Sequence, residues 1–201
     1  MDNLTNIFIG RSGCGKGTQI EKIADFLVEN SNQDRSNIFH LEAGNRFRDF
    51  IKEENYSSHI ANDISEDGGL QPEFLSIWAW GGELIRNLKE DQHLFIDGTP
   101  RRLIEAKVLE SVFDFYNRPK VNIVYINVSR KWAIDRMKNR GRSDDLEDSD
   151  IKNRLDWFDN DVVPVLDYYR SHKQHNFIEI NGEQDIEKVN QDIVSALDLD
   201  K

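Results

Sequence analysis

Apolar segments and amphipathic patterns alternate along the chain. Short apolar runs are separated by longer stretches in which apolar residues recur every three or four positions. The runs predict buried strands, and the longer stretches predict helices that bury one face. The predicted strands are 6–9, 37–40, 93–96, 122–128 and 177–180. Because this alternation is typical of βαβ units, we expect an α/β fold, a doubly wound parallel five-stranded sheet with helices on both faces.

Several helices can be outlined from the same pattern. Apolar positions predict one helix over 20–28 and another over 186–197 that closes the fold. A longer helix is predicted over 151–169, and we expect Pro164 to kink it. A glycine pair at 81–82 interrupts a further helical pattern and indicates either a hinge or a close contact between helices.

The chain reads as one domain. No internal repeat, low-complexity tract or linker divides the sequence, so we expect a single domain over residues 1–201 with two inserts. The first insert spans about 43–88. The second, 140–149, is short, charged and poor in apolar residues, which is typical of a mobile flap.

The strongest chemical signal is the segment G-R-S-G-C-G-K-G-T at residues 10–18, directly after the first predicted strand. Its glycines allow the loop to wrap closely around an anion, with backbone N–H groups pointing inward. Lys16 would reach the outer phosphates, and the helix that begins near it adds the positive end of its dipole. The segment therefore predicts a P-loop NTPase-type phosphate site.

Composition and charge limit the possible partners. The 201 residues carry a formal net charge of -11, which counts against a nucleic-acid surface because such a surface needs an extended positive footprint. The single cysteine, Cys14, excludes an internal disulfide and favours a reducing compartment. The sequence shows neither a secretory signal nor an apolar run long enough for a membrane span, so we expect a cytoplasmic protein with no membrane partner.

A second motif ends the strand predicted at 93–96. Asp97 follows a buried apolar run in a chain that already has a phosphate loop, which is where a carboxylate that organises magnesium would lie. Arg101 would face the same cleft and clamp a phosphate. A helix cap or a turn is the alternative role for this aspartate.

A series of arginines follows in the second half of the chain. Arg136 and Arg140 share one face of a predicted helix, Arg142 comes next, and Arg154 returns from the following helix. Solvated ion pairs are the alternative interpretation of such charged helices. The number of arginines that converge favours an anion site.

Taken in order, these motifs resemble those of the adenylate kinases and related nucleoside monophosphate kinases. The phosphate loop of that family reads G-x-P-G-x-G-K-G-T-Q, against residues 10–19 here. The resemblance covers almost the whole chain, and it continues through residues 43–48, 69–72, 97–101, Arg142 with the two aspartates after it, and Arg154.

The resemblance implies an enzyme that transfers the γ-phosphoryl group of ATP to a nucleoside monophosphate, AMP first, with Mg²⁺ as cofactor. It also implies a monomer with a short lid. The donor nucleotide would contact Gly13, Cys14, Gly15, Lys16, Gly17, Thr18, Arg136 and Gln184. The acceptor would contact Ala43, Gly44, Arg48, Leu70, Gln71, Gly98, Arg101 and Glu105. The catalytic residues would be Lys16, Asp97, Arg101, Arg140, Arg142 and Arg154, with Asp97 holding the metal through water.

Departures from the family pattern leave two questions open. Ala43 and Asn45 stand where the family usually has Thr and Asp, which predicts lower activity or weaker metal binding, and a nucleotide-binding sensor without transfer remains an alternative. Glu105 occupies the position of a glutamine that reads adenine. A carboxylate only accepts hydrogen bonds and suits the two adjacent donors of guanine, so GMP is an alternative acceptor. In the competing interpretation, Glu105 points elsewhere on an exposed helix face or pairs with Arg102.

Two other features receive structural interpretations. His172 and His175 lie near a helix end, but the sequence shows no carboxylate or cysteine to complete a ligand set, so we expect solvent-facing histidines. Trp78 and Trp80 are expected to pack in the core or between helices.

Overall fold

The protein is built around a five-stranded parallel sheet. The computed structural model describes residues 3–30, 34–140 and 148–200. The strand order is β2-β3-β1-β4-β5, and every neighbouring pair is parallel. The strands are β1 (Thr5–Ile9), β2 (Ile38–Glu42), β3 (His93–Asp97), β4 (Asn122–Asn127) and β5 (Asn176–Asn181). The predicted strands are thus confirmed, with boundaries that shift by one or two residues.

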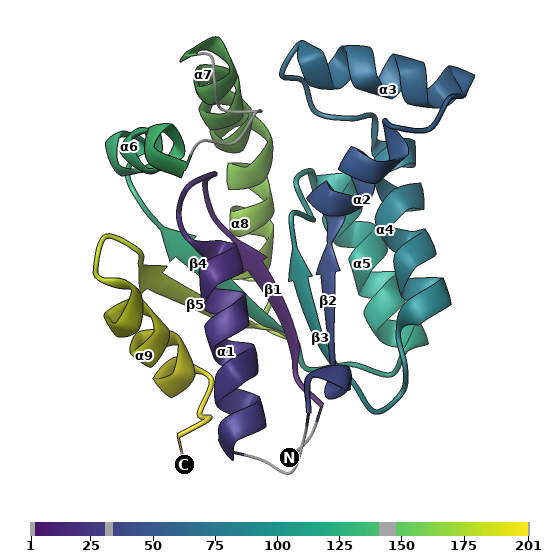
Figure 1. The fold of residues 1–201 in the computed structure, drawn as a ribbon. Coiled ribbons are helices and arrows are strands. Elements are labelled where there is room, and N and C mark those ends of the chain that lie inside the picture. The colour runs from purple at the N-terminus through teal and green to yellow at the C-terminus, as the bar shows by residue number, and fades with distance from the viewer. Residues whose placement is uncertain (1–2, 31–33, 141–147, 201) are drawn as a thin grey trace.

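Helices cover both faces of this sheet. α1 and α9 lie on one face, and α4, α5 and α8 lie on the other (Figure 1). The helices are α1 (Lys16–Asn30), α2 (Ala43–Phe50), α3 (Tyr56–Glu66), α4 (Glu73–Asn87), α5 (Leu103–Phe115), α6 (Arg130–Arg140), α7 (Asp148–Trp157), α8 (Val163–Ser171) and α9 (Ile186–Ala196). A 3-10 turn, η1 (Arg35–Asn37), precedes β2. The predicted doubly wound α/β fold is confirmed.

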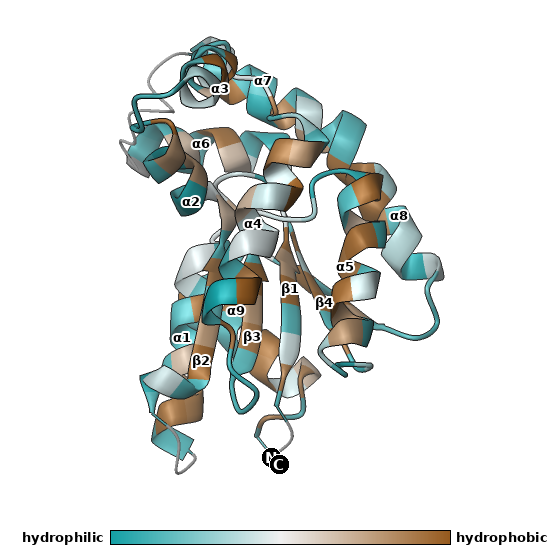
Figure 2. Cartoon of the chain, turned by 90° about the vertical axis from the view of Figure 1, so that its right-hand side faces the viewer, coloured by the Kyte–Doolittle hydropathy of each residue, from teal (hydrophilic) through white to brown (hydrophobic). Residues whose placement is uncertain are grey.

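Alternate strand residues enter two separate cores. Ile7 and Ile96 pack with α4, α5 and α8, whereas Phe8 and Phe95 pack with α1 and α9. Successive side chains of a strand point to opposite faces, so a strand covered on both sides must be apolar throughout. Figure 2 shows the strands largely in brown, while the helices around them carry both colours.

The first insert forms three helices with a small core of their own. Phe50 of α2, Ala61 of α3 and Leu75 of α4 pack together at the upper end of the molecule (Figure 1). The later part of α4 belongs to the main core, where Trp80 and Leu84 are buried. The segment 43–88 is therefore attached to the sheet through the second half of α4.

α4 continues through its glycine pair without a break. A Cβ atom added at Gly81 would meet no atom within 4 Å, and one at Gly82 would meet only the flexible end of Arg86. Close packing therefore does not explain the pair, which leaves the hinge as an untested prediction.

The helix predicted over 151–169 is a continuous helical run with a change of helix type in its middle. α7 ends at Trp157, a π-helical turn η3 (Phe158–Val162) follows, and α8 begins at Val163. Pro164 lies in the first turn of α8, directly after the π-helical turn, in which the Val163 N–H donates to Phe158 O. A single apolar stripe continues through all three segments, which is why the pattern predicts one helix.

Among the described residues, no helix is both long enough and apolar enough to cross a membrane.

Candidate active site

The phosphate loop connects the end of β1 to the start of α1. It lies at the carboxyl edge of the sheet, where the chain turns to β2 and β3 on one side and later to β4 and β5 on the other. Ligands of doubly wound folds bind at this switch point. Gly13 and Gly15 have φ angles of 84° and 97°, a backbone conformation that side-chain-bearing residues rarely adopt. These glycines let the loop fold back on itself in front of α1.

Lys16 lies over its own loop. Its Nζ donates to the carbonyl oxygen of Gly10 at 2.8 Å and to that of Arg11 at 3.4 Å. Cys14 is buried in the core, and its Sγ lies 3.7 Å from Lys16 Nζ. An arriving phosphate would draw the ammonium away from these carbonyls, because an anion is a stronger partner than a neutral oxygen.

A cleft of about 700 Å³ brings most of the predicted site residues together. It runs from the phosphate loop to the first insert and back to α7. The predicted residues that line it are Gly13, Gly15, Lys16, Gly17, Thr18, Ala43, Gly44, Arg48, Leu70, Gln71, Asp97, Gly98, Arg101, Glu105, Arg136 and Arg154. Residues from six separate stretches of sequence thus face one space.

Two carboxylates lie side by side at the strand ends. The register of β2 and β3 places Glu42 opposite Asp97, and both residues line the cleft. Carboxylate oxygens are hard ligands of the kind that Mg²⁺ prefers, so these residues fit a magnesium site near the donor phosphates. No role was predicted for Glu42. Glu42 lies beyond the strand predicted at 37–40, and only the register of β2 and β3 sets it opposite Asp97.

Arg48 forms a contact network with Glu42 and Asn45. Arg48 donates to Glu42 Oε1 at 3.3 Å and also to Asn45 Oδ1, while the Asn45 amide donates to Glu42 Oε2. Asn45, one of the two residues that depart from the family pattern, therefore holds Arg48 and Glu42 in place.

Arg101 lies in the most charged part of the cleft. Burial lowers the pKa of Arg101, the carboxylates of Glu105 and Asp97 oppose that shift, and the positive charges of Arg154 and Arg48 add to it. Its guanidinium carbon lies 5.0 Å from the centroid of the Trp157 ring. Three guanidinium groups and two carboxylates thus lie close together, and the guanidinium groups are donors of the kind that bind phosphate oxygens.

Glu105 is buried against the cleft and is not on an exposed helix face. It is 2% exposed, and its Oε2 accepts from Thr99 Oγ1 at 2.6 Å and from Ser76 Oγ at 3.1 Å. Arg102 instead lies near Glu73 and Asp161. The interpretation in which Glu105 points away from the site is therefore wrong, because Glu105 lines the cleft.

Other predicted site residues lie at the margin or cannot be placed. Arg136 lines the cleft with its guanidinium carbon 5.3 Å from the centroid of Trp132. Gln184 does not line the cleft, and its side chain donates to Asn181 O and to Asp192. Arg142 lies outside the described residues, as does the side chain of Arg140 and most of the lid segment 140–149.

The prediction of solvent-facing histidines is wrong for His175, whereas His172 is partly exposed. His175 is buried, and its ring contacts the carboxylate of Glu110, a residue far away in the sequence. The sequence around 172–175 gives no indication of Glu110, because only the tertiary structure brings α5 to the end of α8. Trp80 is buried in the core, and Trp78 packs against Phe50, as predicted for helix-packing residues.

Comparison with known proteins finds one family across the site. The adenylate kinase family model matches residues 8–174. An adenylate kinase of Prochlorococcus marinus (strain MIT 9515) is 31% identical, over 93% of this chain and 94% of its own length. Adenylate kinase 1 of a Nostoc species is 27% identical, over 95% of this chain and 97% of its own length. The match spans the phosphate loop, the first insert and the arginines of the cleft.

Proposed function

The chain belongs to the adenylate kinase family, and from that premise we propose that it transfers the γ-phosphoryl group of ATP to AMP, giving two molecules of ADP. It is thus a nucleoside monophosphate kinase. The observation that carries the proposal is the single cleft that joins the phosphate loop to Arg48, Arg101 and Arg154. Binding of one nucleotide alone would not need so many positive charges directed at one point.

The transfer needs positioning and charge neutralisation more than a protein nucleophile. An oxygen of the acceptor phosphate forms the new bond to the γ-phosphorus, and the bond from that phosphorus to the β–γ bridging oxygen breaks. Lys16 and the loop amides would hold the donor phosphates, and Arg48 and Arg101 would hold the acceptor phosphate. Arg140, Arg142 and Arg154 would neutralise the charge that spreads over the transferred group.

Asp97 would hold Mg²⁺ through water, and Glu42 beside it would add a second carboxylate to the water shell. When bound, the metal neutralises charge on the donor phosphates. Closure of the segments 43–88 and 140–149 over the cleft would exclude water, which would otherwise hydrolyse the donor. The monomeric state and the cytoplasmic location stay predictions from the sequence.

A second acceptor is favoured by a specific observation. Glu105 offers a buried carboxylate to the acceptor end of the cleft, and two hydroxyl groups already donate to one of its oxygens. An ionised carboxylate suits guanine, which presents two adjacent donors, better than adenine. GMP is therefore the second candidate.

The test is phosphoryl transfer from ATP and Mg²⁺ to AMP, GMP, CMP, UMP and dTMP, each measured separately. We expect transfer to AMP. A preference for GMP would identify Glu105 as the base reader, and Glu105→Gln should then shift the preference towards AMP. ATP binding without transfer to any acceptor would contradict the proposal and favour a nucleotide sensor.

Lys16→Ala should abolish transfer while the protein stays folded. The matched control is Lys22→Ala on the same helix, since Lys22 pairs with Glu187 away from the cleft. Normal turnover by Lys16→Ala would show that the phosphate site is wrongly assigned.

A further inference from the structure

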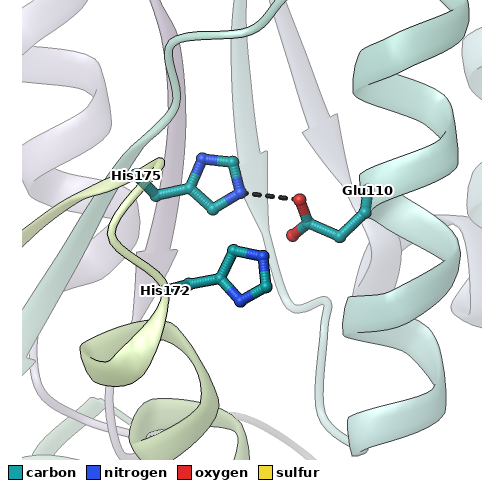
Figure 3. Close-up of side chains that lie close together, drawn as sticks. All are labelled: Glu110, His172 and His175. Carbon is teal, nitrogen blue, oxygen red and sulfur yellow. Dashed lines mark hydrogen bonds and ion pairs between the residues drawn. The ribbon is translucent and has the colours of Figure 1, made fainter.

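Two histidines and a glutamate meet at the edge of the sheet opposite the nucleotide cleft. His172 follows the end of α8, and His175 directly precedes β5. Glu110 comes from α5, whose later half runs to this same edge. Figure 3 shows the three side chains turned towards one another across the space between α5 and the α8–β5 connection. None of these residues lines the cleft described above.

The three side chains are close enough to share one ion. One potential ligand atom from each residue lies within 4.8 Å of the other two. His175 Nε2 lies 2.7 Å from Glu110 Oε2. The two imidazole rings are stacked, with centroids 5.5 Å apart and an interplanar angle of 16°. The cluster thus offers two imidazole nitrogens and one carboxylate from two elements.

Polar atoms of this cluster lack partners. Within the described part of the chain, Glu110 Oε1 and His175 Nδ1 are buried and have no hydrogen-bond partner. The edges and faces of Phe113 and Tyr169 surround the His175 ring, so the neighbourhood is largely apolar. Leaving a buried polar atom unpaired costs free energy, and this cost is expected to be larger for a carboxylate oxygen. A cation between the rings and the carboxylate would remove part of that cost.

We propose that Glu110, His172 and His175 form a binding site for a divalent transition-metal ion, with Zn²⁺ as the ion that fits best. Two imidazoles and one carboxylate are a known Zn²⁺ ligand set, in which water fills the fourth position. Bonds of about 2.0–2.1 Å in tetrahedral geometry place ligand atoms about 3.3 Å apart. The ligand atoms now lie up to 4.8 Å apart, so binding requires the partly exposed His172 side chain to move towards the other two, and the ion would replace the hydrogen bond between His175 and Glu110.

The position of the site defines its role. The ion would join α5 to the connection between α8 and β5, two parts of the core formed with α4, α5 and α8, at the end of the sheet away from the phosphate loop. It would therefore stabilise the fold in proportion to its occupancy and would take no part in phosphoryl transfer.

The test is a Zn²⁺ titration of the nucleotide-free protein by calorimetry. Wild type should bind one Zn²⁺ per chain at this site. His172→Ala should weaken that binding at least about tenfold, the scale on which changes around metal sites act. Glu110→Gln should do the same, because an amide keeps a polar contact to His175 but loses the negative charge. The matched control is His59→Ala, an exposed histidine on α3, which should leave the binding unchanged.

Two further readouts separate metal binding from a merely structural role. Zn²⁺ should raise the melting temperature of wild type and His59→Ala but not that of His172→Ala. Co²⁺ in wild type should give the strong visible absorption of a tetrahedral site. Turnover with Mg²⁺ and ATP should be equal in His172→Ala and wild type, so the outcome is independent of the kinase assignment. Absent Zn²⁺ binding, or equal binding by wild type and His172→Ala, would overturn the proposal.

Discussion

Arg101 shows how the cleft combines burial with a fixed charge. Burial lowers the pKa of Arg101, the carboxylates of Glu105 and Asp97 oppose that shift, and two neighbouring guanidinium groups add to it. A guanidinium group starts from a pKa so high that it stays charged under these conditions, whereas an ammonium group would be easier to deprotonate. The geometry matters as well, because a guanidinium can grip two phosphate oxygens while stacking over Trp157.

Arg101→Lys should therefore reduce kcat/KM for the acceptor by about 100-fold or more, the effect of removing one transition-state donor. Steady-state kinetics with varied AMP measures the loss. Arg170→Lys is the control, because Arg170 pairs with Asp167 and Glu179 outside the cleft. A fold-change below about threefold would mean that Arg101 contributes only charge.

The residue scale also shows where sequence reasoning succeeds and where it ends. The phosphate loop is contiguous, so its chemistry can be predicted from residues 10–18 alone. The place of Glu42 in the site could be inferred only from the strand register, which sets it opposite Asp97. Glu110 and His175 are distant in sequence and meet because α5 and α8 pack on the same face of the sheet. Side chains that only tertiary structure unites leave no local pattern.

At the scale of elements, η3 connects the phosphate loop to the α7–α8 region. Arg11 Nη2 lies 2.6 Å from Asp159 Oδ1, and its guanidinium carbon lies 4.6 Å from the centroid of the Phe158 ring. Asp159 also accepts from Arg130 of α6. A π-helical turn is rare and is often found at functional sites. Here it presents Asp159 to two arginines at once.

Asp159→Asn should raise KM for ATP several-fold, because Arg11 of the phosphate loop would lose the negative charge that holds its side chain in place. The free energy of unfolding should fall by only about 1 kcal/mol, since the partly exposed pair is screened by solvent. Kinetics with varied ATP and urea denaturation measure the two effects. Asp167→Asn is the control, a surface carboxylate paired with Arg170. An unchanged KM would show that η3 does not contribute to donor binding.

The glycine pair of α4 gives a second prediction at this scale. Gly81→Ala should increase the free energy of unfolding by about 0.4–1 kcal/mol, because alanine favours the helix and its Cβ meets no neighbour. Urea denaturation measures this gain. If the pair acts as a hinge, kcat should fall at the same time, whereas an unchanged kcat would exclude that role. Gly82→Ala tests the neighbouring position, where the new Cβ meets only the mobile end of Arg86.

Elements differ in how well the pattern predicts them. The strands are covered on both faces, so short apolar runs mark them clearly. The long helix over 151–169 was predicted, but the π-helical turn inside it was not, because α7, η3 and α8 all bury the same stripe. Hydrophobic periodicity records which face is buried and is insensitive to one extra residue in a helical turn.

At the scale of the whole molecule, the sheet separates two functions of the fold. Its carboxyl edge presents the cleft, and its amino edge carries the Glu110–His172–His175 cluster. β1 and β3 also begin at this amino edge, where Leu4, the residue before β1, contacts the start of β3. The backbone N–H of Leu4 donates to His93 Nδ1 at 2.9 Å, and Leu94 N donates to Leu4 O at 2.8 Å. His93 thus helps to attach the beginning of β1 to β3.

This attachment makes the stability of the whole molecule depend on pH. Burial lowers the pKa of His93, and the charge of Arg118 lowers it further. The folded state therefore holds His93 neutral, while the unfolded chain binds a proton near the ordinary pKa of about 6.5. The unfolded state binds more protons as the pH falls below that value, so stability from this group is complete above pH ~6.5 and declines below it, by at most about 1.4 kcal/mol per pH unit.

His93→Gln tests this dependence, because a glutamine oxygen can still accept from Leu4 but does not titrate. The free energy of unfolding, measured by urea denaturation between pH 5 and pH 8, should fall more steeply with decreasing pH in wild type than in the variant. The difference between the two curves removes the contribution of every other titrating group. The exposed His59 supplies the control, since His59→Gln should leave the wild-type slope intact. If the free energy of unfolding depended on pH equally in wild type and His93→Gln, the acid sensitivity of the fold would come from other residues.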